Sequence, residues 1–258
     1  MNDMILNKKP FSLYQRVCRK IHKVGRTIEG IYQYNVENNI RPLKQKAVSI
    51  ALTYQCNSRC VMCNIWKMKP KNELKIEEWK KIFKDPVFAN IEHCDLTGGE
   101  LSLHPQLVRI VELIIRSMPK LRKLTMVSNG FKTDLVVRQV IAIAKICNKN
   151  NVELSVSISL DGIGQMHEKI RRIPDAFKKT TATLFKLKKI SSKYGFWVGG
   201  GSLVLRQNLA YVDKVKKWFQ DNNVNGTFQV VGFHDTYVNN LNTKKKINFR
   251  KNEQKKIK

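Results

Sequence analysis

Three cysteines stand close together in the segment "CNSRCVMCNIW", at Cys56, Cys60 and Cys63. Cysteine thiolates bind zinc and iron–sulfur clusters, and no fourth cysteine or histidine follows closely behind these three. Structural zinc sites normally close with four protein ligands, whereas three thiolates can hold a [4Fe-4S] cluster and leave one iron open. The spacing therefore favours a cluster with an open coordination position, and a zinc site is the alternative.

The other cysteines offer no fourth ligand. Cys94 and Cys147 lie in apolar runs and are expected to be buried, while Cys18 lies on a predicted basic helix. Six cysteines in 258 residues are too sparse for a disulfide scaffold, so the cluster of three indicates a metal in a reducing compartment. The sequence has no apolar run of about 18 residues and no secretory signal, and we expect a cytoplasmic protein.

The chain is strongly basic, with a formal net charge of +28. Half of this charge lies at the ends, because residues 1–46 carry ten basic and three acidic groups and residues 244–258 carry eight and one. A basic excess favours a polyanionic partner, such as nucleic acid or an anionic membrane surface. The alternative is a solvated, lysine-rich surface. The composition of 35 Lys and 13 Arg favours this alternative, because phosphate recognition usually employs arginine.

Strand-like and helix-like segments alternate along most of the chain. The expected strands are 47–53, 91–97, 121–130, 152–162, 196–205 and 226–233, and the expected helices are 75–83, 105–118, 133–148, 173–193 and 209–221. Parallel neighbours need helix-length connections, so this alternation predicts an α/β fold with a parallel sheet. Periodicity alone leaves an open doubly wound sheet and a curved barrel segment as alternatives.

Polar and glycine residues at the C-terminal ends of the strands favour the barrel. Among them are Cys56, Gly98, Ser128, Ser159 and Gly232. Barrels of alternating strands and helices assemble their active sites at that end. We therefore expect a partial (β/α)6 TIM-type barrel with parallel strands.

Three regions are expected along the chain. Residues 1–46 form a basic extension, in which apolar residues at steps of three and four predict an amphipathic helix over 11–32. This helix would dock on the same protein or on a membrane surface. Residues 47–243 form the partial barrel, and residues 244–258 form a basic tail that is expected to be disordered.

The CxxxCxxC spacing of Cys56, Cys60 and Cys63 resembles the signature of the radical S-adenosylmethionine (SAM) superfamily. The resemblance extends over residues 47 to about 233. It implies a [4Fe-4S] cluster on the three thiolates and SAM on the open iron. Relatives commonly carry an aromatic residue near the SAM adenine where this chain has Met62, and methionine can cover the same apolar surface.

The resemblance also implies a SAM site. "TGGE" is similar to the family's GGE motif, in which Glu100 would receive the SAM amino group while Gly98 and Gly99 let the backbone approach the ligand. Ser159 and Arg171 have the interval of a serine and an arginine that meet the methionine carboxylate.

Other matches to the family are less specific. They are Ser128 and Asn129 near the ribose, with a plain turn as the alternative, Asn208 near SAM, and Val231 and Gly232 as backbone contacts to the adenine. Arg172 competes with Arg171 for its role. His104, His167 and His234 are assigned no role, because a single histidine near a loop is more often structural or solvated.

The implied function is that of a radical SAM enzyme. It would split SAM reductively to a 5'-deoxyadenosyl radical that abstracts hydrogen, with no catalytic side chain beyond the cluster and SAM site. The electron would come from a donor such as flavodoxin or ferredoxin. The substrate is unknown, and a peptide or protein, or a carbohydrate or lipid precursor, is favoured over RNA.

Two other functions stay open. One is a zinc-stabilised nucleic-acid-binding protein that uses the basic ends. The other is a truncated, inactive radical SAM homologue, because the chain has no C-terminal cysteine-rich (SPASM) extension.

Overall fold

The computed structural model of the chain describes residues 24–25, 27–40, 44–68, 72–236, 238–250 and 253. Its contacts divide the chain into two compact units, Met1–Lys44 and Gln45–Lys258. All six described strands lie in the second unit.

The described part of the first unit is helical. Residues 27–32 form a helix that continues into a π-helical turn, η1 (Gln33–Glu37), and a short helix, α2 (Asn38–Ile40). Most of the helix predicted over 11–32 lies outside the described residues. The docking of its apolar stripe therefore stays a prediction.

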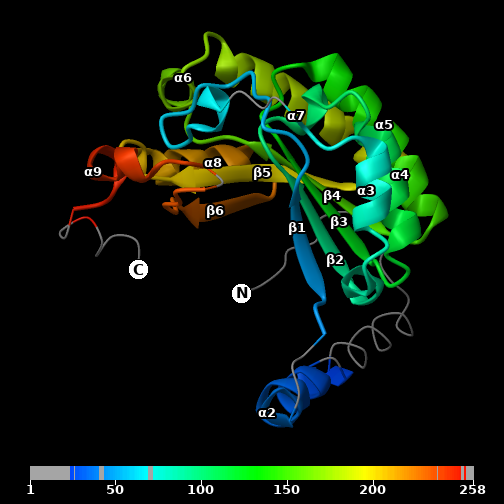
Figure 1. The fold of residues 1–258 in the computed structure, drawn as a ribbon. Coiled ribbons are helices and arrows are strands. Elements are labelled where there is room, and N and C mark those ends of the chain that lie inside the picture. The colour runs from blue at the N-terminus through cyan, green and yellow to red at the C-terminus, as the bar shows by residue number, and fades with distance from the viewer. Residues whose placement is uncertain are drawn as a thin grey trace. The chain divides into compact units, whose positions relative to one another are not determined.

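One parallel sheet organises the second unit. Its strands are β1 (Ala47–Ala51), β2 (His93–Thr97), β3 (Lys123–Ser128), β4 (Glu153–Ser159), β5 (Trp197–Val204) and β6 (Gly226–Val230). They follow the order β1-β2-β3-β4-β5-β6, each parallel to the next, and the sheet curves between the edges β1 and β6 (Figure 1). This confirms the predicted partial barrel over the doubly wound sheet, whose strand order reverses.

One face of this sheet is covered by the helices α3 (Ile76–Ile82), α4 (Leu107–Ser117), α5 (Thr133–Lys149), α7 (Ala176–Tyr194) and α8 (Val212–Asp221) (Figure 1). The core lies between sheet and helices, where Cys94 and Leu96 of β2 and Ile110 and Ile114 of α4 are fully buried. Burying each large apolar side chain contributes roughly 1.5–3 kcal/mol, so this layer holds the strand ends in place.

The other face of the sheet is polar. Ser49, Asp95, Thr125 and Ser155 lie in register across β1 to β4. Ser49 and Asp95 are exposed, whereas Leu96, the next residue of β2, is fully buried. Successive strand residues point to opposite faces, so the polar row lines the interior of the open barrel.

A helix that the sequence analysis did not predict, α6 (Gln165–Arg171), follows β4. It begins after Gly164 and ends at Arg171, and the next residue, Arg172, has a left-handed φ of 54°. Its seven residues are too few for a helical period to be read from the sequence. This short helix carries His167 and Arg171.

Short 3-10 turns lie in the connecting loops. They are η2 (Ile65–Lys67), η3 (Pro86–Asn90), η4 (Leu101–Leu103), η5 (Leu209–Tyr211) and η6 (Leu241–Thr243). The cysteine segment leads directly into η2, and the GGE segment leads directly into η4. Both loops are therefore held by ordered structure on each side.

Residues 244–250 differ from the disordered tail that the sequence predicted. They include α9 (Lys244–Ile247), and Ile247 and Phe249 are buried in an apolar cluster that also contains Cys60. These two apolar side chains anchor the segment beside the cysteine loop despite its many lysines. Most of the remaining tail lies outside the described residues.

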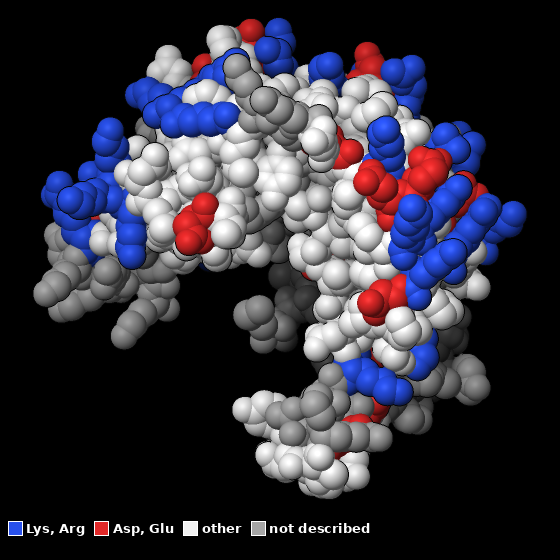
Figure 2. Space-filling model, in the orientation of Figure 1, with Lys and Arg blue, Asp and Glu red and all other residues white. Residues whose placement is uncertain are grey.

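Charged side chains are unevenly spread over the face in Figure 2. Lys and Arg gather over α9, whereas basic and acidic side chains mix over α3 and α4. One such mixed pair on α4 is Glu112 with Arg116, at 2.6 Å. Binding of a polyanion by the basic ends stays a prediction. Within the described residues, no helix combines the length and the apolar character that crossing a membrane requires.

Candidate functional site

The cysteine segment forms the loop between β1 and α3. Cys60 is buried, and Cys56 and Cys63 are half-buried. A hydrogen-bond donor faces each sulfur: the Ser58 N–H donates to Cys56 Sγ at 3.4 Å, the Ser58 hydroxyl lies 3.0 Å from Cys60 Sγ, and the Ile65 N–H donates to Cys63 Sγ at 3.5 Å. Such donors stabilise thiolates, the form of cysteine that binds a metal.

The three thiols are close enough to influence one another's ionisation. Burial raises the pKa of Cys56 to about 12, the Ser58 N–H opposes this, and the charges of Cys60, Glu100 and Cys63 raise it further. Burial also raises the pKa of Cys63 to about 11. Without a cation, both thiols are protonated at neutral pH, so a bound metal must displace their protons.

The thiol set fits a cluster better than a single ion. Among the described residues, no three His, Cys, Asp or Glu side chains converge tightly enough to surround one metal ion. Zinc needs all its donors at about 2.0–2.3 Å from a single centre. A four-iron cluster distributes its thiolates over separate irons and does not need three sulfurs around one centre.

The cysteine loop pairs with α6. The Val61 N–H donates to the Ile170 carbonyl at 2.9 Å. The Arg171 guanidinium forms an ion pair with Asp161, with Nη2 2.6 Å from Oδ2, and its Nη1 donates to Cys60 Sγ at 3.6 Å. Arg171 thus reaches the cysteine loop from a helix that the sequence analysis missed.

Two buried asparagines, which the sequence analysis did not single out, fix the other side of the loop. Asn240 donates to the carbonyls of Met62 at 2.8 Å and Gly232 at 3.0 Å, and Asn64 donates to the Asn239 carbonyl at 2.7 Å. The bond from Asn240 to Met62 spans 178 positions of the chain. A side chain that bonds to such a distant backbone leaves no local pattern in the sequence.

Gly98 and Gly99 let the loop after β2 lie against the loop after β1. The Gly99 N–H donates to the Thr53 carbonyl at 2.6 Å, and Gly98 has a φ of 142°. A Cβ on Gly98 or Gly99 would collide with the carbonyl oxygens of Thr53 and Gln55 respectively. The two glycines therefore allow a close approach to the chain's own backbone, and their approach to a ligand stays a prediction.

The Glu100 carboxylate is buried and already has three donors. The Ser102 N–H and the Ser128 hydroxyl donate to Oε1 at 3.2 and 2.7 Å, and the Asn129 N–H donates to Oε2 at 2.7 Å. A carboxylate accepts roughly four hydrogen bonds, so one position remains. Glu100 thus joins the loop after β2 to the loop after β3.

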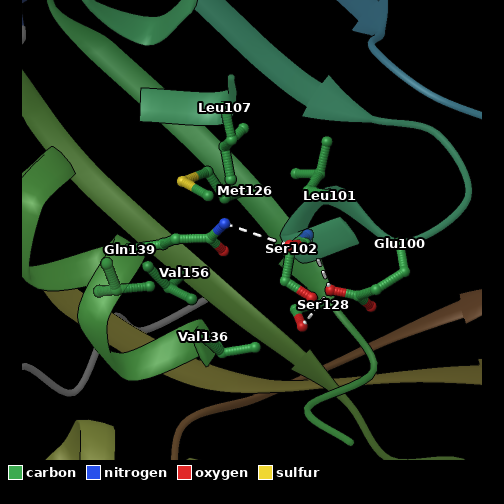
Figure 3. A pocket seen from close by; sticks show the side chains of 10 residues that line it. Glu100, Leu101, Ser102, Leu107, Met126, Ser128, Val136, Gln139 and Val156 are labelled. Carbon is green, nitrogen blue, oxygen red and sulfur yellow. Dashed lines mark hydrogen bonds between the residues drawn. The ribbon is translucent and has the colours of Figure 1, made fainter. Parts of the chain in front are cut away.

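A small cavity lies behind this carboxylate. Figure 3 shows Glu100, Ser102 and Ser128 turned toward one another, with Gln139 of α5 donating to the Ser102 carbonyl at 3.1 Å. The cavity has a volume of about 10 Å³, which is room for about one water. The cavity is too small for a nucleotide.

A chain of hydrogen bonds joins the loops after β1, β3 and β4. Asn129 Nδ2 donates to Asn57 Oδ1 at 2.7 Å, and the Thr180 hydroxyl donates to the Asn129 carbonyl at 2.8 Å. Thr180 Oγ1 also lies 3.3 Å from His167 Nε2, and the Asp161 N–H donates to His167 Nδ1 at 3.0 Å. His167, to which the sequence assigned no role, therefore holds the ends of two strands together.

Several weaker matches have structural partners. Asn208 is buried and donates to the carbonyls of Asp161 and Leu203 at 2.8 and 2.9 Å, which ties the ends of β4 and β5 together. Met62 and Val231 share the apolar cluster beside the cysteine loop.

Ser159 and Arg172 occupy different surroundings. Ser159 is the last residue of β4 and is half-buried at the barrel mouth. Arg172 is exposed beyond the end of α6. The ion-pair partner of Arg171 is Asp161, so the structure orients Arg171, and not Arg172, toward the cysteines.

A cleft of about 500 Å³ opens beside Cys56. Its lining combines two aromatic rings, amide side chains and a cation, and includes Tyr54, Gln55, Asn57, Trp66 and Lys132. The volume is within the range of ligand pockets. The Trp66 indole N–H donates to the Cys63 carbonyl at 2.9 Å, which connects the cleft wall to a second cysteine.

A family model described as "Radical SAM superfamily" matches residues 50–219, which extend from β1 to α8. The chain belongs to the radical SAM superfamily. The cofactors of this superfamily are a [4Fe-4S] cluster and SAM, and the three thiols fit the cluster. Membership favours the enzyme class over the zinc-stabilised nucleic-acid-binding protein.

Curated relatives include two proteins of Bacillus subtilis (strain 168). The antilisterial bacteriocin subtilosin biosynthesis protein AlbA is 26% identical over 213 residues, which are 81% of this chain and 42% of AlbA. The sporulation killing factor maturation protein SkfB is 27% identical over 140 residues, 54% of this chain and 32% of SkfB. The chain thus spans less than half the length of these relatives.

Solved structures share the fold. Streptococcus suis SuiB bound to SAM aligns with a TM-score of 0.56 and 12% identity, over 89% of this chain and 49% of SuiB. The enzyme anSMEcpe with bound AdoMet and the Kp18Cys peptide aligns with a TM-score of 0.56 and 20% identity, over 72% of this chain and 51% of anSMEcpe. At these low sequence identities, the structural similarity shows only that the chain shares the partial-barrel fold of these proteins.

Proposed function

We propose that this radical SAM chain cleaves SAM reductively and abstracts a hydrogen atom from a peptide substrate. The observation that carries the proposal is the set of three free thiols, each facing a donor, on the loop after β1. When bound, the cluster and SAM supply the one-electron cleavage that yields a 5'-deoxyadenosyl radical. The residues of the chain bind and orient the two cofactors and exclude water.

Each part of the SAM site has a proposed role. Cys56, Cys60 and Cys63 hold the cluster, and the remaining acceptor position of Glu100 receives the SAM amino group. Gly98 and Gly99 hold Glu100 in place by fixing its loop against the loop after β1.

The other end of SAM meets residues from β3, β4, α6 and the cysteine loop. Ser159 and Arg171 bind the methionine carboxylate, and Arg171 Nε is a buried donor with no hydrogen-bond partner among the described residues. Met62, in the apolar cluster with Val231, covers the adenine, and Ser128 fixes the loop near the ribose.

A peptide is the substrate class that the similarities favour. AlbA and SkfB are named for the biosynthesis of a bacteriocin and the maturation of a killing factor, and SuiB and anSMEcpe have been solved with peptides. The polar interior row of Ser49, Asp95, Thr125 and Ser155 offers hydroxyl and carboxylate partners to a peptide backbone.

An external protein supplies the electron, and we place its entry at Trp66. Arg59 and Lys67, both exposed, lie over the Trp66 ring at 5.1 and 5.2 Å, and this indole is bonded to the Cys63 carbonyl. Two cations next to the cluster loop suit an acidic carrier such as flavodoxin or ferredoxin.

The test is anaerobic reconstitution with iron and sulfide, followed by incubation with SAM and dithionite. We expect 5'-deoxyadenosine from the wild type and from Cys147→Ala, which loses a thiol far from the loop, and none from Cys63→Ala. A colourless protein that binds zinc stoichiometrically and cleaves no SAM would contradict the proposal.

The substrate class is tested with deuterated peptides. Transfer of deuterium from the peptide into 5'-deoxyadenosine identifies the carbon that is attacked. Transfer from a labelled sugar or lipid precursor, and from no peptide, would contradict the peptide assignment while leaving SAM cleavage intact.

A further inference from the structure

The guanidinium of Arg171 is a buried cation in direct contact with a proposed cluster ligand. Its side chain is 11% exposed, and its Nη1 donates to Cys60 Sγ at 3.6 Å. Its countercharge is Asp161, whose side chain is fully buried and whose Oδ2 lies 2.6 Å from Arg171 Nη2. The contact therefore places the cationic member of a buried ion pair against the sulfur of Cys60.

Arg171 is the charged side chain of α6 that contacts the cysteine loop. His167, four residues earlier on α6, adds no charge, because burial and the Arg171 cation lower its pKa to about 2. Arg171 is thus the cation of α6 that contacts the cysteines, while Lys169 of α6 and Arg172 after it are exposed.

Reduction adds one electron to a cluster and makes the ligand shell more negative. The reduction potential of an iron–sulfur cluster depends on net charge, on hydrogen bonds to its sulfurs and on solvent exposure. A buried guanidinium that donates to a ligand sulfur stabilises the reduced state more than the oxidised state.

We propose that Arg171, restrained by Asp161, is a positioning residue that raises the reduction potential of the cluster through its contact with Cys60. This inference rests on the proposed function, since it requires the cluster. The step that it affects transfers one electron from an external reductant to the cluster and breaks no bond in the protein.

The side chain can be altered without removing the backbone links of the loop. The Arg171 carbonyl accepts hydrogen bonds from the Arg59 N–H at 3.1 Å and from the Ser58 hydroxyl at 3.3 Å. These bonds do not involve the guanidinium. Substitution of the side chain therefore separates its charge from the backbone attachment of α6 to the cysteine loop.

The experiment measures the midpoint potential of the reconstituted cluster, without SAM, by a redox titration followed by electron paramagnetic resonance. We expect Arg171→Gln to shift the potential to a more negative value, because the cation is lost. Asp161→Asn should shift it to a more positive value, because the cation loses its countercharge and the amide oxygen can still accept the Leu203 N–H. Arg172→Gln is the matched control and should leave the potential unchanged.

The two opposite shifts distinguish charge from general damage. Equal potentials in Arg171→Gln and Arg172→Gln, or shifts of the same sign in Arg171→Gln and Asp161→Asn, would overturn the inference. If Arg171→Gln binds no cluster, two other variants decide. Arg171→Lys must then have the midpoint potential of the wild type, to within the difference between Arg172→Gln and the wild type. Asp161→Asn must still have a more positive midpoint potential. A wild type that holds no iron–sulfur cluster at all would instead refute the proposed function.

Discussion

His167 accepts, through Nδ1, a hydrogen bond of 3.0 Å from the backbone N–H of Asp161. Because Nδ1 accepts, a neutral ring carries its proton on Nε2, which faces the Thr180 hydroxyl at 3.3 Å. Burial, followed by the positive charge of Arg171, lowers the pKa of His167 from 6.5 to about 2. The ring is therefore neutral in the folded chain.

The free energy of unfolding should fall as the pH falls through about 6.5. Between pH 2 and pH 6.5 the unfolded chain protonates this histidine and the folded chain does not, so acid favours unfolding. From pH 7 to pH 5.5 the loss due to His167 is about 1 kcal/mol. Urea unfolding at the two pH values measures it.

His167→Asn should remove this part of the pH dependence, because the replacement cannot take up the proton. The exposed His234→Asn is the control and should retain the pH dependence of the wild type. An identical pH dependence in His167→Asn and the wild type would show that the folded chain also protonates His167.

The cysteines should differ in their reaction with iodoacetamide. Cys94 and Cys147 are 0% exposed, whereas Cys56 and Cys63 are half-buried, so the reagent has access only to the loop cysteines. The pKa is raised at all four thiols and therefore does not separate the two pairs. Peptide mapping of the metal-free protein should find label on Cys56 and Cys63, with Cys94 and Cys147 labelled only in denaturant.

Reconstitution should protect the loop cysteines from the same reagent. Equal labelling of Cys56 and Cys63 before and after iron and sulfide are added would argue against a cluster on these residues. Early labelling of Cys147 in the native protein would contradict the buried position between sheet and helices.

Gly99→Ala should destabilise the site. Its Cβ would occupy the position of the Gln55 carbonyl, and forcing extra volume into a closely packed contact typically costs about 1–3 kcal/mol. We expect a lower thermal midpoint and less iron bound per chain. In the control Gly232→Ala, the new Cβ would meet the ring of the exposed His234 at 3.2 Å, and this side chain can move.

Lys67→Glu should slow reduction of the cluster by reduced flavodoxin several-fold and leave reduction by dithionite unchanged. The lysine lies over Trp66, and reversing its charge would repel an acidic carrier at the cluster loop. Lys193→Glu is a matched control, because Lys193 lies over the Tyr194 ring at 5.5 Å. Equal slowing by both variants would place the docking surface elsewhere.

The local sequence pattern was sufficient to predict the strands of the sheet and the loops that carry the cysteines and the GGE segment. All six strands begin and end within a few residues of the predicted runs, because apolar strands between amphipathic helices are a local signal. The spacing of Cys56, Cys60 and Cys63 likewise lies within one loop. The helix α6 was missed because it is short, and the order at 244–250 was missed because Ile247 and Phe249 pack on residues distant in sequence.

The sequence by itself determined the parallel (β/α) order, the three thiols on one loop and the family to which they belong. Tertiary structure alone decided the partners of those residues: Arg171 with Asp161 and Cys60, Asn240 with Met62, and Glu100 with Ser128. The physical reason is that periodicity and motif spacing are properties of neighbours along the chain. A buried charge or amide must instead be satisfied by whatever group folding brings to it, however distant in sequence.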